Sequence, residues 1–255
     1  MQDFQAFDSP SATELVAARQ TFAKPLIEEL RNKLPISSAA DVGCGVGYFS
    51  KFLHELGLRV TGIDARKENV EECKRRYPDI IFESGDAEDL RADGVGTFDL
   101  VLCFGLLYHL ENPFRAIRNL YSMTGQVLLV ESMCAPGENP SMELLDEYHV
   151  ENQGLGFVAF YPTEACLVKM LYRAGFRFVY GFEKLPDHEE FHATRQKVRR
   201  RTMMVASQRE LEATGLRRLP EPQRIAEIWS KPSRPRIARL ANLVRRLVAA
   251  EETKT

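Results

Sequence analysis

The stretch Asp41-Val42-Gly43-Cys44-Gly45-Val46-Gly47-Tyr48-Phe49 decides the fold of this 255-residue chain. It follows small and apolar residues at 36–40, and it precedes apolar residues at helical spacing from Phe49 to Leu56. The predicted order is strand, glycine-rich turn, helix, which brings a ligand against backbone amides at a helix N-terminus. Glycines suit such a turn because, without Cβ atoms, they allow a tight bend and the close approach of a ligand.

The spacing of the glycines distinguishes this turn from a dinucleotide-binding turn, which has the pattern G-x-G-x-x-G. Here Gly43, Gly45 and Gly47 alternate with other residues, and Asp41 stands two residues before the first glycine. A carboxylate at this place repels a pyrophosphate but suits the ammonium group of a bound amino acid. The pattern D-x-G-x-G-x-G resembles motif I of the class I S-adenosylmethionine (SAM) methyltransferases, and the resemblance implies SAM contacts at Asp41, the three glycines and Cys44. The alternative is a glycine-rich turn in another α/β protein.

A second strand is predicted at 58–64, and it ends in an acid. Asp64 lies 17 residues after Gly47, where a nucleoside-binding α/β unit places a carboxylate that accepts from both ribose hydroxyls. Ala65 follows directly and belongs to the same predicted site. The alternative is that Asp64 only caps the helix expected after it.

Two further strand ends complete the predicted cofactor site. Strand 80–84 precedes Asp86 and Ala87. By the family resemblance, this acid accepts from the adenine amino group and the next backbone N–H binds a ring nitrogen, whereas a helix-capping Asp is the alternative. Strand 98–103 is almost entirely apolar, as the buried strands of parallel sheets are, and Phe104 leaves its C-terminal end.

Tyr108 and His109 are the candidate catalytic residues. They follow strand 98–103, at the kind of strand end where ligands bind in open α/β sheets. Because histidine titrates near working pH, His109 is a candidate base for the proton released during methyl transfer. The alternative is that His109 packs beside the strand end or caps it.

Further candidate substrate contacts come from segments expected around this edge of the sheet. Residues 132–160 are long for a connection, and their polar and aromatic mixture predicts a substrate-facing lid that carries Tyr148 and His149. Phe22 is a candidate from the N-terminal helices, with packing on the sheet edge as the alternative. Tyr161 is a candidate from the start of a later helix.

A closer resemblance concerns the run Gly105-Leu106-Leu107-Tyr108-His109-Leu110, the Tyr161-Pro162-Thr163 helix start and the Arg-rich approach to the last predicted strand. All three are similar to the enzymes that install a carboxymethyl-derived group on the wobble uridine of tRNA from carboxy-SAM, and equally to methyltransferases of sugars and small metabolites. By this resemblance Arg201 faces a carboxylate on the donor or the substrate. Because the terminal segments differ from those of the tRNA enzymes, we favour a small-molecule or glycan acceptor, with oxygen as the expected methylated atom. A tRNA-modifying alkyl transferase that uses SAM or carboxy-SAM ranks second, and a SAM-binding protein without catalysis is the third hypothesis.

The predicted fold is an α/β, Rossmann-like, seven-stranded sheet of the class I methyltransferase type, with SAM at its C-terminal edge. We divide the chain into N-terminal cap helices at 1–35, a SAM-binding methyltransferase domain at 36–207 with the lid insertion at 132–160, and a basic helical tail at 208–255.

The net charge of −2 conceals a division along the chain. Residues 195–248 contain 15 Lys and Arg against 4 Asp and Glu, and an apolar stripe near 236–249 predicts an amphipathic helix. A basic amphipathic helix suits an anionic membrane surface or a nucleic acid, but the stripe also suits packing on the domain itself or in a homodimer. We favour packing within the protein or its dimer, with peripheral membrane contact and nucleic acid as the alternatives.

The remaining features exclude other classes of protein. No apolar run reaches the about 18 residues of a membrane span, and the acidic N-terminus lacks the basic region of a secretory signal. Five scattered cysteines predict reduced thiols, so the expected location is cytoplasmic. The run His188-Glu189-Glu190-Phe191-His192 matches H-E-x-x-H, but a charged turn just after Pro186 does not provide the long helix of a metalloprotease, so no metal is expected.

Overall fold

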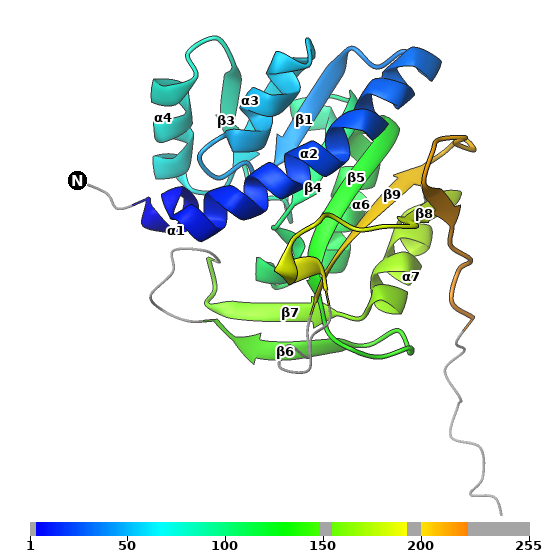
Figure 1. Cartoon of the computed structure of the whole chain (residues 1–255). Coiled ribbons are helices and arrows are strands. Elements are labelled where there is room, and N and C mark those ends of the chain that lie inside the picture. The colour runs from blue at the N-terminus through cyan, green and yellow to red at the C-terminus, as the bar shows by residue number, and fades with distance from the viewer. Residues whose placement is uncertain (1–3, 148–154, 193–199, 224–255) are drawn as a thin grey trace, which may run out of the picture. The chain divides into compact units, whose positions relative to one another are not determined.

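An eight-stranded sheet forms the centre of the computed structural model, which describes residues 4–147, 155–192 and 200–223 (Figure 1). Its strands are β1 (Ser38–Val42), β2 (Arg59–Asp64), β3 (Ile81–Ser84), β4 (Phe98–Phe104), β5 (Thr124–Cys134), β8 (Phe178–Phe182), β9 (Arg200–Ser207) and β10 (Leu216–Arg218). They lie in the order β10-β8-β9-β5-β4-β1-β2-β3. β1 to β5 pair in parallel, whereas β8, β9 and β10 pair antiparallel with their neighbours. The parallel half therefore comes first in the chain, as predicted.

Helices cover both faces of this sheet. They are α1 (Gln5–Asp8), α2 (Pro10–Lys33), α3 (Tyr48–Glu55), α4 (Lys67–Arg76), α5 (Ala92–Val95), α6 (Pro113–Met123) and α7 (Glu164–Ala174). The side chains of α2, α3 and α4 join one hydrophobic core, and those of α6 and α7 join a second core on the other face. Within the described ranges, no helix has the length and apolar character needed to cross a membrane.

Alternate residues of the central strands point to opposite faces. Leu100 and Leu102 of β4 belong to the core under α2 and α3, whereas Val101 and Cys103 belong to the core under α6 and α7. Both faces are buried, which explains why the strand is apolar at almost every position. The predicted Rossmann-like α/β fold is confirmed. All five cysteines are free thiols, and four of them are buried.

The segment after β9 continues the sheet beyond the predicted boundary between residues 207 and 208. β10 pairs antiparallel with β8 and adds an eighth strand to the seven that were predicted. The amide of Leu219 donates to the carbonyl of Val179 at 2.8 Å. Residues 208–223 are not helical, and the helix expected near 236–249 lies outside the described residues.

A chain that ends at Ser207 is expected to unfold about 4–8 °C lower than a chain that ends at Gln223. The shorter chain lacks β10 and the buried Leu211, whose amide donates to the hydroxyl of Tyr180 at 2.8 Å. Loss of one buried Leu side chain costs about 2 kcal/mol, which corresponds to this shift in Tm for a domain of this size. Equal Tm values for the two chains in thermal unfolding would contradict this account of the segment.

The predicted lid at 132–160 contains a small sheet of its own. β5 continues to Cys134, so the first residues of that range belong to the main sheet. β6 (Met142–Asp146) and β7 (Val158–Pro162) form a separate antiparallel pair, which Figure 1 shows at the edge where β5 ends. Residues 148–154 lie outside the described ranges.

Candidate active site

The turn after β1 is built around glycines with positive φ. Gly43, Gly45 and Gly47 have φ angles of +77°, +54° and +87°, a region that L side chains rarely adopt. A Cβ on Gly43 would also lie 2.9 Å from the side chain of Leu106. The amide of Gly43 donates to the carbonyl of Ile63 at 2.8 Å, which ties the turn to β2. The turn therefore requires glycine for its backbone shape as well as for the close approach of a ligand.

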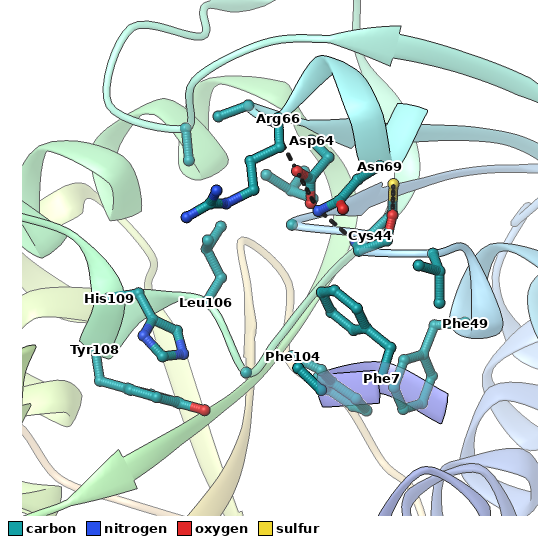
Figure 2. Close-up of a pocket in the computed structure, with 18 of the residues that line it drawn as sticks. Phe7, Cys44, Phe49, Asp64, Arg66, Asn69, Phe104, Leu106, Tyr108 and His109 are labelled. Atoms are coloured by element: carbon teal, nitrogen blue, oxygen red, sulfur yellow. Dashed lines mark hydrogen bonds between the residues drawn. The ribbon is translucent and has the colours of Figure 1, made fainter. Parts of the chain in front are cut away.

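Asp64 ends β2 beside this turn (Figure 2). Its Oδ2 accepts from the amide of Gly45 at 2.9 Å. Its Oδ1 accepts from the amide of Arg66 at 3.0 Å and from the side-chain amide of Asn69 at 3.1 Å. Burial raises the pKa of Asp64, and these hydrogen bonds oppose the rise. Since a carboxylate has about four lone-pair sites, Asp64 keeps capacity for a further donor from a ligand.

A cavity of about 1120 Å³ lies at the carboxyl ends of β1, β2 and β4. In Figure 2, Asp64 and Arg66 lie on one side of it, and Tyr108 and His109 lie on the other. The structure brings most of the sequence-predicted residues to the lining of this cavity: Gly43, Cys44, Gly45, Asp64, Ala65, Asp86, Ala87, Phe104, Tyr108, His109 and Arg201.

Three other predicted residues have different surroundings. At Gly47 a Cβ would meet Tyr77, so this glycine serves the shape of the turn. Phe22 packs edge-on against Phe182, with ring centroids 4.9 Å apart, which agrees with the alternative of packing on the sheet. Tyr161 packs edge-on against Tyr108 at 5.8 Å and so lies behind the cavity wall. Outside the described residues lie two further predicted contacts, Tyr148 and His149.

Asp41 lies beneath the turn and not in the cavity wall. It is 2% exposed, and the hydroxyl of Ser50 on α3 donates to its Oδ2 at 2.6 Å. The predicted direct contact with a ligand's ammonium group does not agree with this placement. Burial raises the pKa of Asp41 to about 7, while the hydrogen bonds from Ser50 oppose the rise.

Replacing Asp41 by Asn is expected to flatten the pH dependence of stability between about pH 4 and pH 7. The pKa of this carboxyl has its ordinary value of 3.8 in the unfolded chain and is about 7 in the folded protein. At pH values between the two, the folded state therefore holds one more proton than the unfolded chain. The free energy of unfolding then falls as the pH rises, by up to about 1.4 kcal/mol per pH unit, and Asn removes this contribution. Thermal unfolding of both proteins from about pH 4 to pH 8 measures the difference, and parallel curves would contradict the prediction.

The short 3-10 turn η1 (Leu107–His109) places two rings next to one another on the cavity wall. The ring centroids of Tyr108 and His109 are 4.1 Å apart. Nδ1 of His109 contacts Oε1 of Glu147, the residue that follows β6. The side chains of His109 and Glu147 are 11% and 10% exposed. The site thus contains a histidine already paired with a carboxylate, and the sequence did not predict that partner.

A buried group of charges lies next to Tyr108. Glu131 of β5 is fully buried, with Oε1 at 3.1 Å from Nη1 of Arg201 and Oε2 at 3.5 Å from Nη2 of Arg19. The same Arg201 nitrogen donates to the Tyr108 hydroxyl at 3.0 Å, and Glu190 lies 3.5 Å from Nε of Arg201. Burial lowers the pKa of Arg19. For Arg201 the effect of burial is outweighed by Tyr108 and Glu131, which raise its pKa above the ordinary value. Arg201 therefore already has an internal carboxylate partner.

The first helix reaches the glycine turn. Phe7 of α1 lies so close to Gly45 that a Cβ there would be 2.6 Å from its ring (Figure 2). Asp8 accepts from Arg76 at 2.6 and 2.9 Å and from the hydroxyl of Tyr48 at 2.7 Å, and the hydrogen bonds from Arg76 lower the pKa of Asp8. The local sequence gives no signal for these contacts, because the partners lie far apart in the chain.

The H-E-x-x-H run forms a short 3-10 turn, η2 (Glu189–Phe191), between β8 and β9. The amide of Glu190 donates to Nδ1 of His188 at 3.2 Å. The predicted turn is present, but it is not simply a solvated one, because Phe191 is buried and His188 lines the cavity.

The fold and the site together define a class of protein. A glycine turn after the first parallel strand, an acid at the end of the second and a cavity at the carboxyl edge characterise a Rossmann-like domain for a nucleoside-containing cofactor. Residues 40–126 match the family model described as a methyltransferase domain. Residues 40–126 therefore carry a methyltransferase domain, and the resemblance to class I SAM-dependent methyltransferases drawn from motif I is confirmed.

Solved structures are similar to this chain in fold. The N-terminal domain of EvdMO1 with SAH bound has a TM-score of 0.61 at 19% sequence identity, over 74% of this chain and 81% of that one. Magnesium protoporphyrin IX methyltransferase (ChlM) from Synechocystis PCC 6803 with bound SAM has a TM-score of 0.53 at 21% identity, over 80% of this chain and 88% of that one.

Curated relatives match a shorter segment. The ubiquinone biosynthesis O-methyltransferase of Xanthomonas campestris pv. campestris (strain B100) is 34% identical over 97 residues, which is 36% of this chain and 41% of the relative. The protein of the same name from Caulobacter vibrioides is 35% identical over 82 residues, which is 31% of this chain and 32% of the relative. The matches span less than half the length of these relatives.

Proposed function

We propose that this chain transfers a methyl group from SAM to an oxygen atom of a small-molecule or sugar acceptor. The observation that carries the proposal is the cavity that joins the glycine turn and Asp64 to Tyr108 and His109. A cofactor held by the glycine turn and Asp64 would share this space with an acceptor beside Tyr108 and His109. The methyltransferase-domain match covers both sides of the cavity, from the turn to η1.

The residues of the cavity fit SAM. Asp64 would accept from the ribose, the backbone of the glycine turn would lie against the amino-acid part, and Asp86 and Ala87 would bind adenine. The volume of about 1120 Å³ exceeds the about 300–1,000 Å³ of most ligand pockets, which leaves room for an acceptor as well. When bound, SAM supplies an electrophilic methyl group whose sulfur leaves with its electron pair as a neutral thioether.

The chain itself has to orient the acceptor and take up one proton. In this proposal His109 accepts the hydroxyl proton of the acceptor, so that the oxygen can use its electron pair for the new bond to carbon. Tyr108 adds a polar group beside His109. Because Arg201 donates to the Tyr108 oxygen, the phenolic O–H remains able to donate to an acceptor.

The charge of the cavity supports a small acceptor over tRNA. Among the described residues, eight acids and four arginines line it, the acids being Glu14, Asp64, Asp86, Glu88, Asp89, Glu111, Glu189 and Glu190. Nucleic-acid sites require an excess of basic side chains because they neutralise phosphates. The names of the curated relatives, which are O-methyltransferases, support oxygen as the methylated atom.

The tRNA-modifying and non-catalytic alternatives are less well supported. The carboxylate that Arg201 was expected to face is provided internally by Glu131, so Arg201 needs no carboxy-SAM for charge balance. A non-catalytic role leaves the pairing of His109 with Glu147 unexplained. Homodimer formation, peripheral membrane contact and a cytoplasmic location stay predictions, and the first two rest on a helix outside the described residues.

SAH release with a panel of simple phenols, catechols and hexoses tests the proposed function. We expect release above the no-acceptor background with at least one hydroxylated compound, and a lower release at limiting SAM with the Asp64→Ala variant. Release that depends on added tRNA would contradict the proposal in favour of the RNA alternative. SAM binding without any turnover would favour the non-catalytic alternative.

A further inference from the structure

Glu147 lies in the inserted β6–β7 sheet, far in sequence from the residue it contacts. We infer that Glu147 is a positioning residue that fixes the tautomer and orientation of His109 and thereby makes Nε2 the nitrogen that accepts the acceptor's proton. The inference rests on the proposed function for its role in methyl transfer. The contact between Glu147 Oε1 and His109 Nδ1 is independent of that function.

The chemistry of the pair follows from which atoms can donate. An ionised carboxylate only accepts hydrogen bonds, so the Nδ1 that it contacts has to carry the proton. In a neutral imidazole the lone pair is then on Nε2. When Nε2 takes the hydroxyl proton of the acceptor, the ring becomes a cation and Nδ1 keeps its own proton. The negative charge of Glu147 stabilises this imidazolium, as a carboxylate does beside the histidine of a catalytic triad.

The backbone holds Glu147 in place for this role. The amide of Glu147 donates to the carbonyl of Phe157 at 3.0 Å, which extends the β6–β7 ladder by one residue. On the same pair of strands Tyr161 packs against Tyr108, the ring neighbour of His109. The insertion therefore contacts η1 at both aromatic residues, and the catalytic edge of the sheet is incomplete without it.

Burial makes the pairing energetically significant. Both side chains are about nine-tenths buried, and a hydrogen bond to a charged group is stronger in such surroundings than at the surface. A contact that only stabilised the fold would hold the same tautomer. The dependence of the Glu147 effect on an intact His109 in the kinetics is therefore the property that separates a positioning role from a merely structural one.

Histidine nitrogen NMR on the full chain tests the inference without any acceptor. The resonances of His109 are assigned by their absence in His109→Asn. We expect the wild-type ring to carry its proton on Nδ1, and we expect Glu147→Ala to lose this preference. Asp146→Asn is the matched control, because Asp146 is the neighbouring acid on β6 and is exposed. A wild-type ring protonated on Nε2, or a ring unchanged by Glu147→Ala, would overturn the inference.

Kinetics provide the second readout. Glu147→Gln is expected to lower kcat by about 10- to 100-fold, a part of the about 10²- to 10⁴-fold that general base catalysis contributes, with the KM for SAM unchanged. In the His109→Asn background the same change should have no further effect, because the two residues act as one unit. Glu147→Asp is expected to restore part of the lost rate. Additive effects of the two substitutions would refute the inference.

The two experiments separate this inference from the proposed function. A ring held with its proton on Nδ1 by Glu147, in a protein that releases no SAH with any acceptor, would leave the pairing intact and refute methyl transfer. Methyl transfer that proceeds at the wild-type rate in Glu147→Gln would leave the proposed function intact and refute the positioning role of Glu147.

Discussion

Replacing His109 by Asn is expected to lower the rate of methyl transfer by about two to four orders of magnitude, the usual contribution of a general base. The variant removes the nitrogen that accepts the acceptor's proton but leaves the glycine turn and Asp64 unchanged. We therefore expect the affinity for SAM to stay within about twofold of the wild type. Steady-state kcat and calorimetric titration with SAM measure the two quantities on the same preparation.

The matched control for this variant is His54→Asn. His54 is on α3 and is exposed, so its replacement should change neither turnover nor SAM affinity. A fully active His109→Asn variant would remove the residue from the mechanism. Loss of SAM binding together with activity would assign His109 to the cofactor side of the cavity.

Replacing Asp64 by Ala is expected to weaken SAM binding by about 1–3 kcal/mol, or about 5- to 150-fold in Kd, through the loss of hydrogen bonds to a charged group. Because Asp64 also accepts from the amide of Gly45, the Ala variant loosens the glycine turn as well. Asp64→Asn keeps an acceptor oxygen and removes the charge. It should show a smaller loss of affinity with a Tm close to that of the wild type.

The control for Asp64 is Asp79→Ala, which removes an exposed acid from the connection between α4 and β3. Calorimetry should give the same Kd for this variant as for the wild type. An Asp64→Ala variant that stays folded and binds SAM with wild-type affinity would refute the assignment of Asp64 to the ribose.

The residues that the sequence predicted well are those fixed by local geometry. The turn at 43–47 needs positive φ angles, and Asp64 follows from the length of one βαβ unit. Asp41 illustrates the limit of this reasoning. Its place before the glycines predicted a ligand contact, but strand alternation turns its side chain toward Ser50 on α3, and the motif spacing alone does not show this.

The parts that the sequence did not predict depend on contacts between distant segments. Glu147 meets His109 only because β6 and β7 form a sheet beside η1. The pairing of Glu131 with Arg19 and Arg201 joins three elements in the same way. β10 has only three residues, too few for a period-two pattern to identify a strand.

The fate of a labelled methyl group decides between a small-molecule acceptor, RNA and no acceptor. The full chain is incubated with methyl-labelled SAM and a cell extract, and the products are separated into small molecules, RNA and protein. We expect label in the small-molecule fraction, attached through oxygen, with the signal lost in His109→Asn and kept in His54→Asn. Label in the RNA fraction, or none in any fraction from a protein that binds SAM, would contradict it.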